Sequence, residues 1–208
     1  MIIGICGFIG SGKGTVGDIL HHKYRFEKDS FARPLKDAAA AIFGWNRDLL
    51  EGDTTQSRAW REQPDEFWSR AFGRAFTPRE ALQKLGTEAG RNVFHPDIWS
   101  SSLIKRSLHK NIVITDVRFK NEVQTIRDHN GILIWVIRGE HPNWYEVALR
   151  ANAGDTDALI TMTNSNIHLS EWDWVGTQFD ATIHNDHTLP DLERSVDAVI
   201  GNLNYVRH

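Results

Sequence analysis

The sequence predicts an α/β protein with a mostly parallel, five-stranded sheet and helices on both faces of that sheet. Short apolar runs alternate with helical patterns along the 208 residues, which is typical of consecutive strand–helix units. A glycine-rich stretch, GFIGSGKGT at residues 7–15, directly joins the first apolar run to a helical pattern. The length suits one domain over residues 1–208, and no repeat or low-complexity linker divides it.

The first elements follow from the N-terminal pattern. Residues 2–6, IIGIC, are apolar throughout, as expected of a strand that is covered on both faces. The pattern predicts a helix over about residues 13–22 and a second helix over about residues 34–43. Gly44 ends the second helix, because glycine is favoured just past a helix C-terminus.

The later elements repeat the alternation. Residues 111–115 and 132–137 predict buried strands, and residues 119–129 between them predict a helix. Residues 181–186 predict a last, shorter strand. The amphipathic segment 189–203 predicts a C-terminal helix whose apolar side carries Leu192, Val196 and Val199.

Two long segments interrupt the alternation. Residues 45–76 are rich in Trp and Arg and favour helix, whereas residues 139–170 show little core periodicity. Excursions of this length in a compact domain are usually lids or binding lobes, so we expect both to be moving parts. A helix begins after the first excursion, where Thr77 and Glu80 form a capping-box pattern and Pro78 fits the first turn.

Composition narrows the class of function. The formal net charge of −3 and the pI of about 6.4 argue against a nucleic-acid polymer as partner, which usually meets a basic surface. No apolar run approaches the length needed to cross a bilayer, and the N-terminus has no basic leader. Cys6 is the only cysteine, and the ten histidines lack zinc-site spacing. We expect a soluble cytoplasmic protein without a membrane partner.

The stretch at 7–15 follows the phosphate-binding pattern G-x-x-x-x-G-K-[ST] except at its last position, where Gly14 stands and Thr15 comes one place late. In such a loop, successive N–H groups and the positive end of the following helix hold a phosphate, and Lys13 reaches its outer oxygens. The missing hydroxyl removes a direct Mg²⁺ ligand. The ending G-K-G-T resembles nucleoside monophosphate kinases, where the metal is held mostly through water.

A second motif, NIVITDVRFKNEV, places Asp116 just after a buried strand. Ligands of open α/β sheets sit at the carboxyl ends of the strands, which is also the edge that carries the phosphate loop. Asp116 is therefore expected to orient Mg²⁺ through water or to contact an acceptor, and Arg118 is expected to meet a phosphate. Glu122 lies on the helix that follows.

With these motifs the chain resembles the bacteriophage-type deoxynucleoside monophosphate kinases. The matching pieces span most of the chain, and the pair LGTEAGR and DVRFKNE is more specific than the glycine loop. The pieces are GFIGSGKGT (7–15), FARPLK (31–36), LQKLGTEAGR (82–91), DIW (97–99), ITDVRFKNEV (114–123), HLSEW (168–172) and ATIHND (181–186). The resemblance implies a P-loop kinase fold, ATP with Mg²⁺, and transfer of the γ-phosphoryl group to a deoxynucleoside 5′-monophosphate.

The resemblance also implies site residues. The ATP phosphates would be held by Gly10, Ser11, Gly12, Lys13, Gly14 and Thr15. The acceptor would be held by Arg33, Lys36, Arg91, Trp99, Asp116, Arg118 and Glu122, with Trp99 packing on the base. Residues 45–76 would form an acceptor-side excursion and residues 139–170 a lid.

The chemistry asks for positioning and positive charge rather than a strong base, because the acceptor phosphate oxygen is already nucleophilic. Lys13, Arg118 and Arg138, which ends the strand at 132–137, are the candidate catalytic residues. The lid segment contains Arg150 as its single arginine and has no lysine. Arginines of the other excursion, Arg58, Arg61, Arg70 and Arg74, are therefore alternatives.

Two other functions remain open at the level of sequence. Another small-molecule P-loop kinase would share the loop and differ only in the acceptor pocket. A nucleotide-binding switch would require a guanine-reading N-K-x-D motif, which is absent, and the hydroxyl that Gly14 replaces. The expected partners are ATP and a deoxynucleoside monophosphate, with a homodimer as a further expectation and a role in deoxynucleotide metabolism, in host cytoplasm if the source is viral.

Overall fold

The computed structural model describes the backbone of residues 1–206 and the side chains of residues 1–203. Its contacts divide the chain into two compact units. The first unit combines Met1–Ser30 with the chain from Ser107 onward, and the second is Phe31–Arg106. The expectation of a single domain over residues 1–208 stays a prediction, since the division into units describes contacts alone.

The first unit is built on a five-stranded sheet in the order β2-β3-β1-β4-β5, and all four strand pairs are parallel. The predicted α/β class with a parallel sheet is confirmed. The strands are β1 (Ile2–Cys6), β2 (Glu27–Asp29), β3 (Ile112–Ile114), β4 (Ile132–Ile137) and β5 (Ala181–His184). Sequence patterns missed β2, because this edge strand consists of the polar residues Glu, Lys and Asp.

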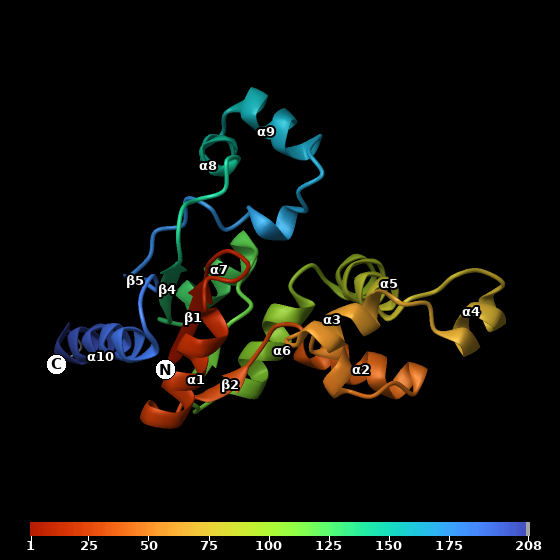
Figure 1. The fold of residues 1–208 in the computed structure, drawn as a ribbon, viewed down its shortest axis with the longest axis horizontal. Coiled ribbons are helices and arrows are strands. Elements are labelled where there is room, and N and C mark those ends of the chain that lie inside the picture. The colour runs from red at the N-terminus through yellow and green to blue at the C-terminus, as the bar shows by residue number, and fades with distance from the viewer. Residues whose placement is uncertain (207–208) are drawn as a thin grey trace. The chain divides into compact units, whose positions relative to one another are not determined.

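Helices cover both faces of this sheet (Figure 1). Helices α1 (Lys13–Tyr24) and α10 (Leu189–Val206) pack on one face through a buried cluster that includes Leu20, Val196 and Ile134. Helix α7 (Lys120–Asp128) covers the other face, where a Cβ on Gly4 would lie 2.4 Å from the end of the Ile126 side chain. Glycine therefore lets α7 approach the sheet closely.

The excursion at 139–170 contains two short helices, α8 (Tyr145–Asn152) and α9 (Thr156–Thr163), and a single 3-10 turn at Leu169–Glu171. The two helices pack on each other through buried small and flexible side chains, namely Ala148, Ala151, Ala158 and Met162. Only about one residue per turn is buried, which explains why periodicity was weak in the sequence.

The second unit is helical. Its elements are α2 (Arg33–Phe43), a 3-10 turn at Asp48–Leu50, α3 (Thr55–Glu62), α4 (Glu66–Phe72), α5 (Pro78–Gln83), a π-helical stretch at Lys84–Phe94 and α6 (Ile98–Ser107). The tryptophans of residues 45–76 form its core: Trp45 stacks on Phe43, and Trp68 donates from Nε1 to the Phe43 carbonyl at 2.9 Å. Among the described residues, no helix is both long and apolar enough to span a membrane.

The predicted capping box at Thr77 forms only in part. The Thr77 hydroxyl accepts from the Glu80 N–H at 3.1 Å, as expected. The Glu80 carboxylate instead accepts two bonds from Arg74, at 2.7 and 2.8 Å. The reciprocal bond was wrongly predicted because a bidentate arginine outcompetes a neutral backbone N–H for the same carboxylate.

Candidate active site

The glycine loop joins the carboxyl end of β1 to the start of α1. Gly12 precedes the helix with a φ of 99°, and a Cβ there would lie 2.2 Å from Asn185 Nδ2. Only glycine combines this backbone conformation with such a close approach. No side chain among the described residues caps the first turn of α1, so its N–H groups are available to an anion such as phosphate.

Lys13 folds back over this loop. Its ammonium donates to the carbonyls of Gly7 and Phe8, each at 2.8 Å. Burial and, as a smaller cause, the neighbouring Arg118 guanidinium together lower the pKa of Lys13 from its ordinary 10.5 to about 8. Among the residues that the structure describes, the ammonium bonds neutral carbonyls alone, so a phosphate placed here would gain a strong charge-assisted partner.

Asn185 braces the loop from β5. Its side chain donates from Nδ2 to the Ser11 carbonyl at 2.9 Å, and its backbone N–H donates to the Ile137 carbonyl at 2.8 Å. Ser11 is 3% exposed, and its hydroxyl has no hydrogen-bond partner among the described residues. Sequence reasoning did not assign Asn185 to the site, although its place directly after a strand of the sheet was a usable signal.

An aromatic cluster ties the start of the loop to the base of the lid segment. Phe8 meets the rings of Trp144 and Tyr145 edge-on, at centroid distances of 5.4 and 6.0 Å. Trp174, from the segment that returns to β5, lies 5.0 Å from the Phe8 ring. The Phe8 carbonyl also accepts a hydrogen bond from Lys13. A displacement of this cluster would therefore change the position of Lys13 in the loop.

The turn after β3 is organised by Glu122, which is 3% exposed. Its Oε2 accepts from the N–H groups of Arg118 and Phe119, at 2.9 and 3.1 Å. A carboxylate is favourable here because the start of α7 presents unpaired N–H groups. Glu122 therefore shapes the backbone of the DVR turn; its predicted contact with the acceptor stays a prediction.

Arg118, in the same turn, forms an ion pair with Glu171 and affects the pKa of Lys13. Its Nη1 donates to Oε1 of Glu171 at 2.8 Å, across 53 residues of sequence. Arg118 acts on the pKa of Lys13 by repulsion, and Glu171 acts on it in the opposite direction. Two of the predicted catalytic residues, Lys13 and Arg118, thus interact electrostatically with each other and with Glu171, a carboxylate from the HLSEW motif.

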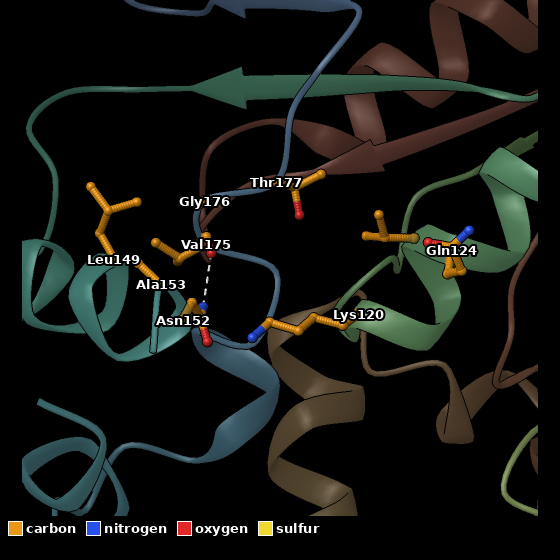
Figure 2. A pocket seen from close by; sticks show the side chains of 9 residues that line it. Lys120, Gln124, Leu149, Asn152, Ala153, Val175, Gly176 and Thr177 are labelled. Carbon is orange, nitrogen blue, oxygen red and sulfur yellow. Dashed lines mark hydrogen bonds between the residues drawn. The ribbon is translucent and has the colours of Figure 1, made fainter. Parts of the chain in front are cut away.

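The lid segment returns to the sheet through an anchored stretch at residues 172–175. Asn152 donates from Nδ2 to the carbonyls of Trp172 and Val175, each at 2.8 Å. Figure 2 shows the bond to Val175 beside a pocket of about 370 Å³, across which Lys120 extends toward Asn152. The pocket is lined by Lys120, Val123, Gln124, Leu149, Asn152, Ala153, Val175, Gly176 and Thr177.

Three other predicted residues of the first unit lie as follows. Asp116 is half-buried, two residues after β3 and in the same turn as Arg118. Arg138 is exposed just after β4 and has no hydrogen bond or ion pair with any described residue. Arg150 is exposed on α8, with Nη1 3.8 Å from Asp155. The catalytic role of Arg138 and the lid role of Arg150 stay predictions.

The second unit holds the other predicted acceptor residues. Arg33 begins α2, and Arg91 lies in the π-helical stretch. Lys36 pairs with Glu51 at 2.5 Å. Although burial acts to raise the pKa of Glu51, Lys36 and Arg47 hold it below its ordinary value. Lys36 thus has a carboxylate partner, and its acceptor role stays a prediction.

Trp99 is fixed within the same unit. Its Nε1 donates to the Gly86 carbonyl at 2.9 Å, and a Cβ on Gly90 would lie 2.6 Å from its ring. The glycines of LGTEAGR therefore make room for the indole. Packing of Trp99 on a base stays a prediction.

The alternative arginines differ in how they are engaged. Arg74 is held by Glu80, and Arg58 donates to the Asp53 carbonyl at 3.3 Å. Arg61 lies against Gly52, and burial, followed by the charge of Arg79, lowers its pKa. Arg70 is exposed near the end of α4.

Comparison with known proteins gives two relatives by sequence, and no protein-family model matches the chain. A protein of Acanthamoeba polyphaga mimivirus, provisionally named deoxynucleotide monophosphate kinase, is 34% identical over 171 residues, covering 73% of this chain and 83% of the relative. The deoxynucleoside-5′-monophosphate kinase of Escherichia phage T5 is 25% identical over 183 residues, covering 62% of this chain and 73% of the relative. Among solved structures, a shikimate kinase from Aquifex aeolicus aligns over 99% of both chains with 14% identity and a TM-score of 0.48.

Proposed function

Because this chain belongs to the deoxynucleotide monophosphate kinase family, we propose that it transfers the γ-phosphoryl group of ATP to a deoxynucleoside 5′-monophosphate, giving ADP and the diphosphate. The observation that carries the proposal is the phosphate loop: an uncapped helix start with a lysine bonded only to neutral carbonyls. This arrangement suits the β- and γ-phosphates of a nucleotide. The position of the loop after β1, the central strand of a five-stranded parallel sheet, supports a P-loop kinase fold.

On the ATP side, the N–H groups of residues 10–15 would bind the phosphates, and Lys13 would exchange the Gly7 and Phe8 carbonyls for phosphate oxygens. Arg118 would stabilise charge on the migrating phosphoryl group, since it shares an electrostatic environment with Lys13. Arg138 is a second candidate because its exposed guanidinium follows β4, next to β1 in the sheet. An arginine in this role contributes about 10³–10⁵ in rate.

On the acceptor side, the roles proposed for binding the monophosphate follow the motifs of the family. Trp99 would pack on the base and Arg150 would act from the lid. Those proposed to surround the phosphate and sugar are Arg33, Lys36, Arg91, Asp116, Arg118 and Glu122. The family resemblance of their motifs supports these roles.

Mg²⁺ is part of the proposal. Among the described residues, no group of three or more His, Cys, Asp or Glu could hold a metal ion, and Gly14 offers no hydroxyl. Mg²⁺ keeps several waters and binds through one or two carboxylates plus substrate phosphates, so one carboxylate, that of Asp116 after β3, would be enough. Asp116 would hold it through water, and the bound ion would neutralise phosphate charge.

The proposed partners are the two small-molecule substrates, without a nucleic-acid polymer or a membrane, and a homodimer is part of the same proposal. The net charge of −3 supports the first point. The viral sources of the two relatives support action in host cytoplasm.

A coupled ADP-release assay tests the proposal. ATP with Mg²⁺ is offered with dTMP, dGMP, dCMP, dAMP and their ribose counterparts to the parent chain, Lys13→Ala and the matched surface variant Lys105→Ala. We expect turnover with at least one deoxy acceptor, its loss in Lys13→Ala, and its retention in Lys105→Ala. Absence of turnover with every acceptor, while ATP binding is measurable, would contradict the proposed function.

A further inference from the structure

We propose that Glu171 positions Arg118 for phosphoryl transfer; this inference rests on the proposed kinase function. The two side chains meet at 2.8 Å, between Arg118 Nη1 and Glu171 Oε1. Arg118 is 41% exposed, so much of its guanidinium is left to contact a substrate, whereas Glu171 is 25% exposed. The bond to Glu171 fixes one N–H donor of the planar guanidinium, and it thereby fixes the orientation of the other N–H groups.

Glu171 can act this way because its own backbone is anchored. It ends the 3-10 turn at Leu169–Glu171, and the next residue, Trp172, is 4% exposed. Asn152 bonds the carbonyls of Trp172 and Val175, as Figure 2 shows for Val175. Asp173 accepts from the Lys120 N–H at 2.8 Å, which ties the same stretch to the start of α7.

Arg118 is held at both ends by different carboxylates. Glu122 accepts from its backbone N–H at 2.9 Å, and Glu171 accepts from its guanidinium. The first contact sets the turn; the second restricts a long side chain that would otherwise sample many rotamers. A fixed guanidinium is what a charge-stabilising role requires, because the group then needs no reorganisation during the reaction.

Glu171 also reduces the electrostatic cost of having two cations, Lys13 and Arg118, near each other. Arg118 and Lys13 repel each other, and Glu171 opposes this effect on the pKa of Lys13. Without the carboxylate, both cations would face one phosphate site with less compensation. The stretch that follows the lid segment thereby supplies a carboxylate that offsets the repulsion between these two cations.

Kinetics of a double-mutant cycle test the proposal. We expect Glu171→Gln to lower kcat about 10-fold, because the amide oxygen accepts from Arg118 without the negative charge that strengthens the bond, with the KM for ATP changed by less than about twofold. In an Arg118→Ala background the same substitution should change kcat by less than about twofold, because its target is gone. The matched control, Asp157→Asn, removes an exposed carboxylate from α9 and should leave kcat unchanged.

A second readout does not depend on turnover. The Nε–Hε signal of Arg118, assigned by its loss in Arg118→Lys, should show an ordered guanidinium in the parent chain and a mobile one in Glu171→Gln. If the parent has no kinase activity, the proposed function fails, and this signal still decides whether Glu171 orders Arg118.

Three results would overturn the inference: an unchanged Arg118 signal, an unchanged kcat, or an equal loss of kcat in both backgrounds. If Glu171→Gln lowers the melting temperature markedly, Glu171→Asp replaces it, since it keeps the charge and shortens the reach. It is then expected to lower kcat in the parent background and not in the Arg118→Ala background.

Discussion

Raising the pH from 7 to 8.5 should make ATP binding take up a proton at Lys13. In the ATP-free protein, burial and Arg118 lower the pKa of Lys13 to about 8. The phosphates of ATP favour the charged ammonium and should raise this pKa again toward its ordinary 10.5. Because ATP binds the charged form more tightly, its affinity should fall as the pH rises from about 8 and level off near the pKa of the complex.

The size of the effect follows from these two pKa values. At pH 8.5 about a quarter of the free protein carries a charged Lys13, against nearly all of the complex, so binding takes up about 0.7 proton. At pH 7 the uptake is about 0.1 proton. A difference of about 2.5 between the pKa values corresponds to about 3 kcal/mol of ATP affinity over the whole range.

Isothermal calorimetry measures this uptake. ATP with Mg²⁺ is titrated at pH 7 and pH 8.5 in two buffers of different ionisation enthalpy, and the slope of heat against that enthalpy gives the protons exchanged. Lys13→Arg is the matched control, because a guanidinium stays charged at both pH values and should take up no proton. Equal heats in the two buffers at pH 8.5, or equal uptake by Lys13→Arg, would refute the reasoning.

The same depressed pKa affects the stability of the ATP-free protein with the opposite sign. The folded state binds the Lys13 proton less tightly than the unfolded chain does, so Lys13 lowers stability below pH 8. Its contribution to the free energy of unfolding should rise between about pH 8 and pH 10.5, where the unfolded chain still holds the proton. Denaturant unfolding of the parent chain and Lys13→Met over this range isolates the effect.

Further predictions concern the loop, the lid base and the C-terminal helix. Gly12→Ala should abolish ATP binding by calorimetry, because φ is 99° and the new Cβ would lie 2.2 Å from Asn185 Nδ2; retained affinity would show that the loop can shift. The control Gly201→Ala, with open space around it in α10, should instead raise stability by up to about 1 kcal/mol. Asn152→Ala should lower the free energy of unfolding by about 1–3 kcal/mol, since Nδ2 bonds buried carbonyls at the lid base. The exposed control Asn143→Ala should change it by less than about 0.5 kcal/mol, and equal effects of the two would contradict the anchoring role.

Local sequence patterns were enough to predict the buried strands and the phosphate loop. A buried parallel strand is apolar along its whole length, and β1, β3 and β4 are recognisable for that reason alone. The phosphate loop depends on glycines that are adjacent in sequence to Lys13, so its geometry follows from a short segment. In contrast, β2 pairs with β3 through its backbone while its side chains are polar, and no local pattern marks such a strand.

The functional roles of charged residues were harder to predict because a charge is compatible with many partners. Glu122 was predicted as an acceptor contact, and the structure shows it capping the turn of Arg118. Lys36 was predicted to meet a phosphate, and it pairs with Glu51. The Trp-rich residues 45–76 were expected to form a lid or binding lobe, and their tryptophans pack in the core cluster of the second unit.

The sequence by itself determined the class of fold, the phosphate loop and the family, because each shows in local patterns: alternating apolar and helical runs, one glycine-rich stretch and a set of short motifs. Only the tertiary structure decided that Glu171 meets Arg118, that Asn185 braces Ser11, and that Asn152 anchors the return of the lid. These contacts join residues that lie 53, 174 and 20 positions apart. Their partners are chosen by the sheet order and by the path of the lid segment, and no spacing along the chain encodes that choice.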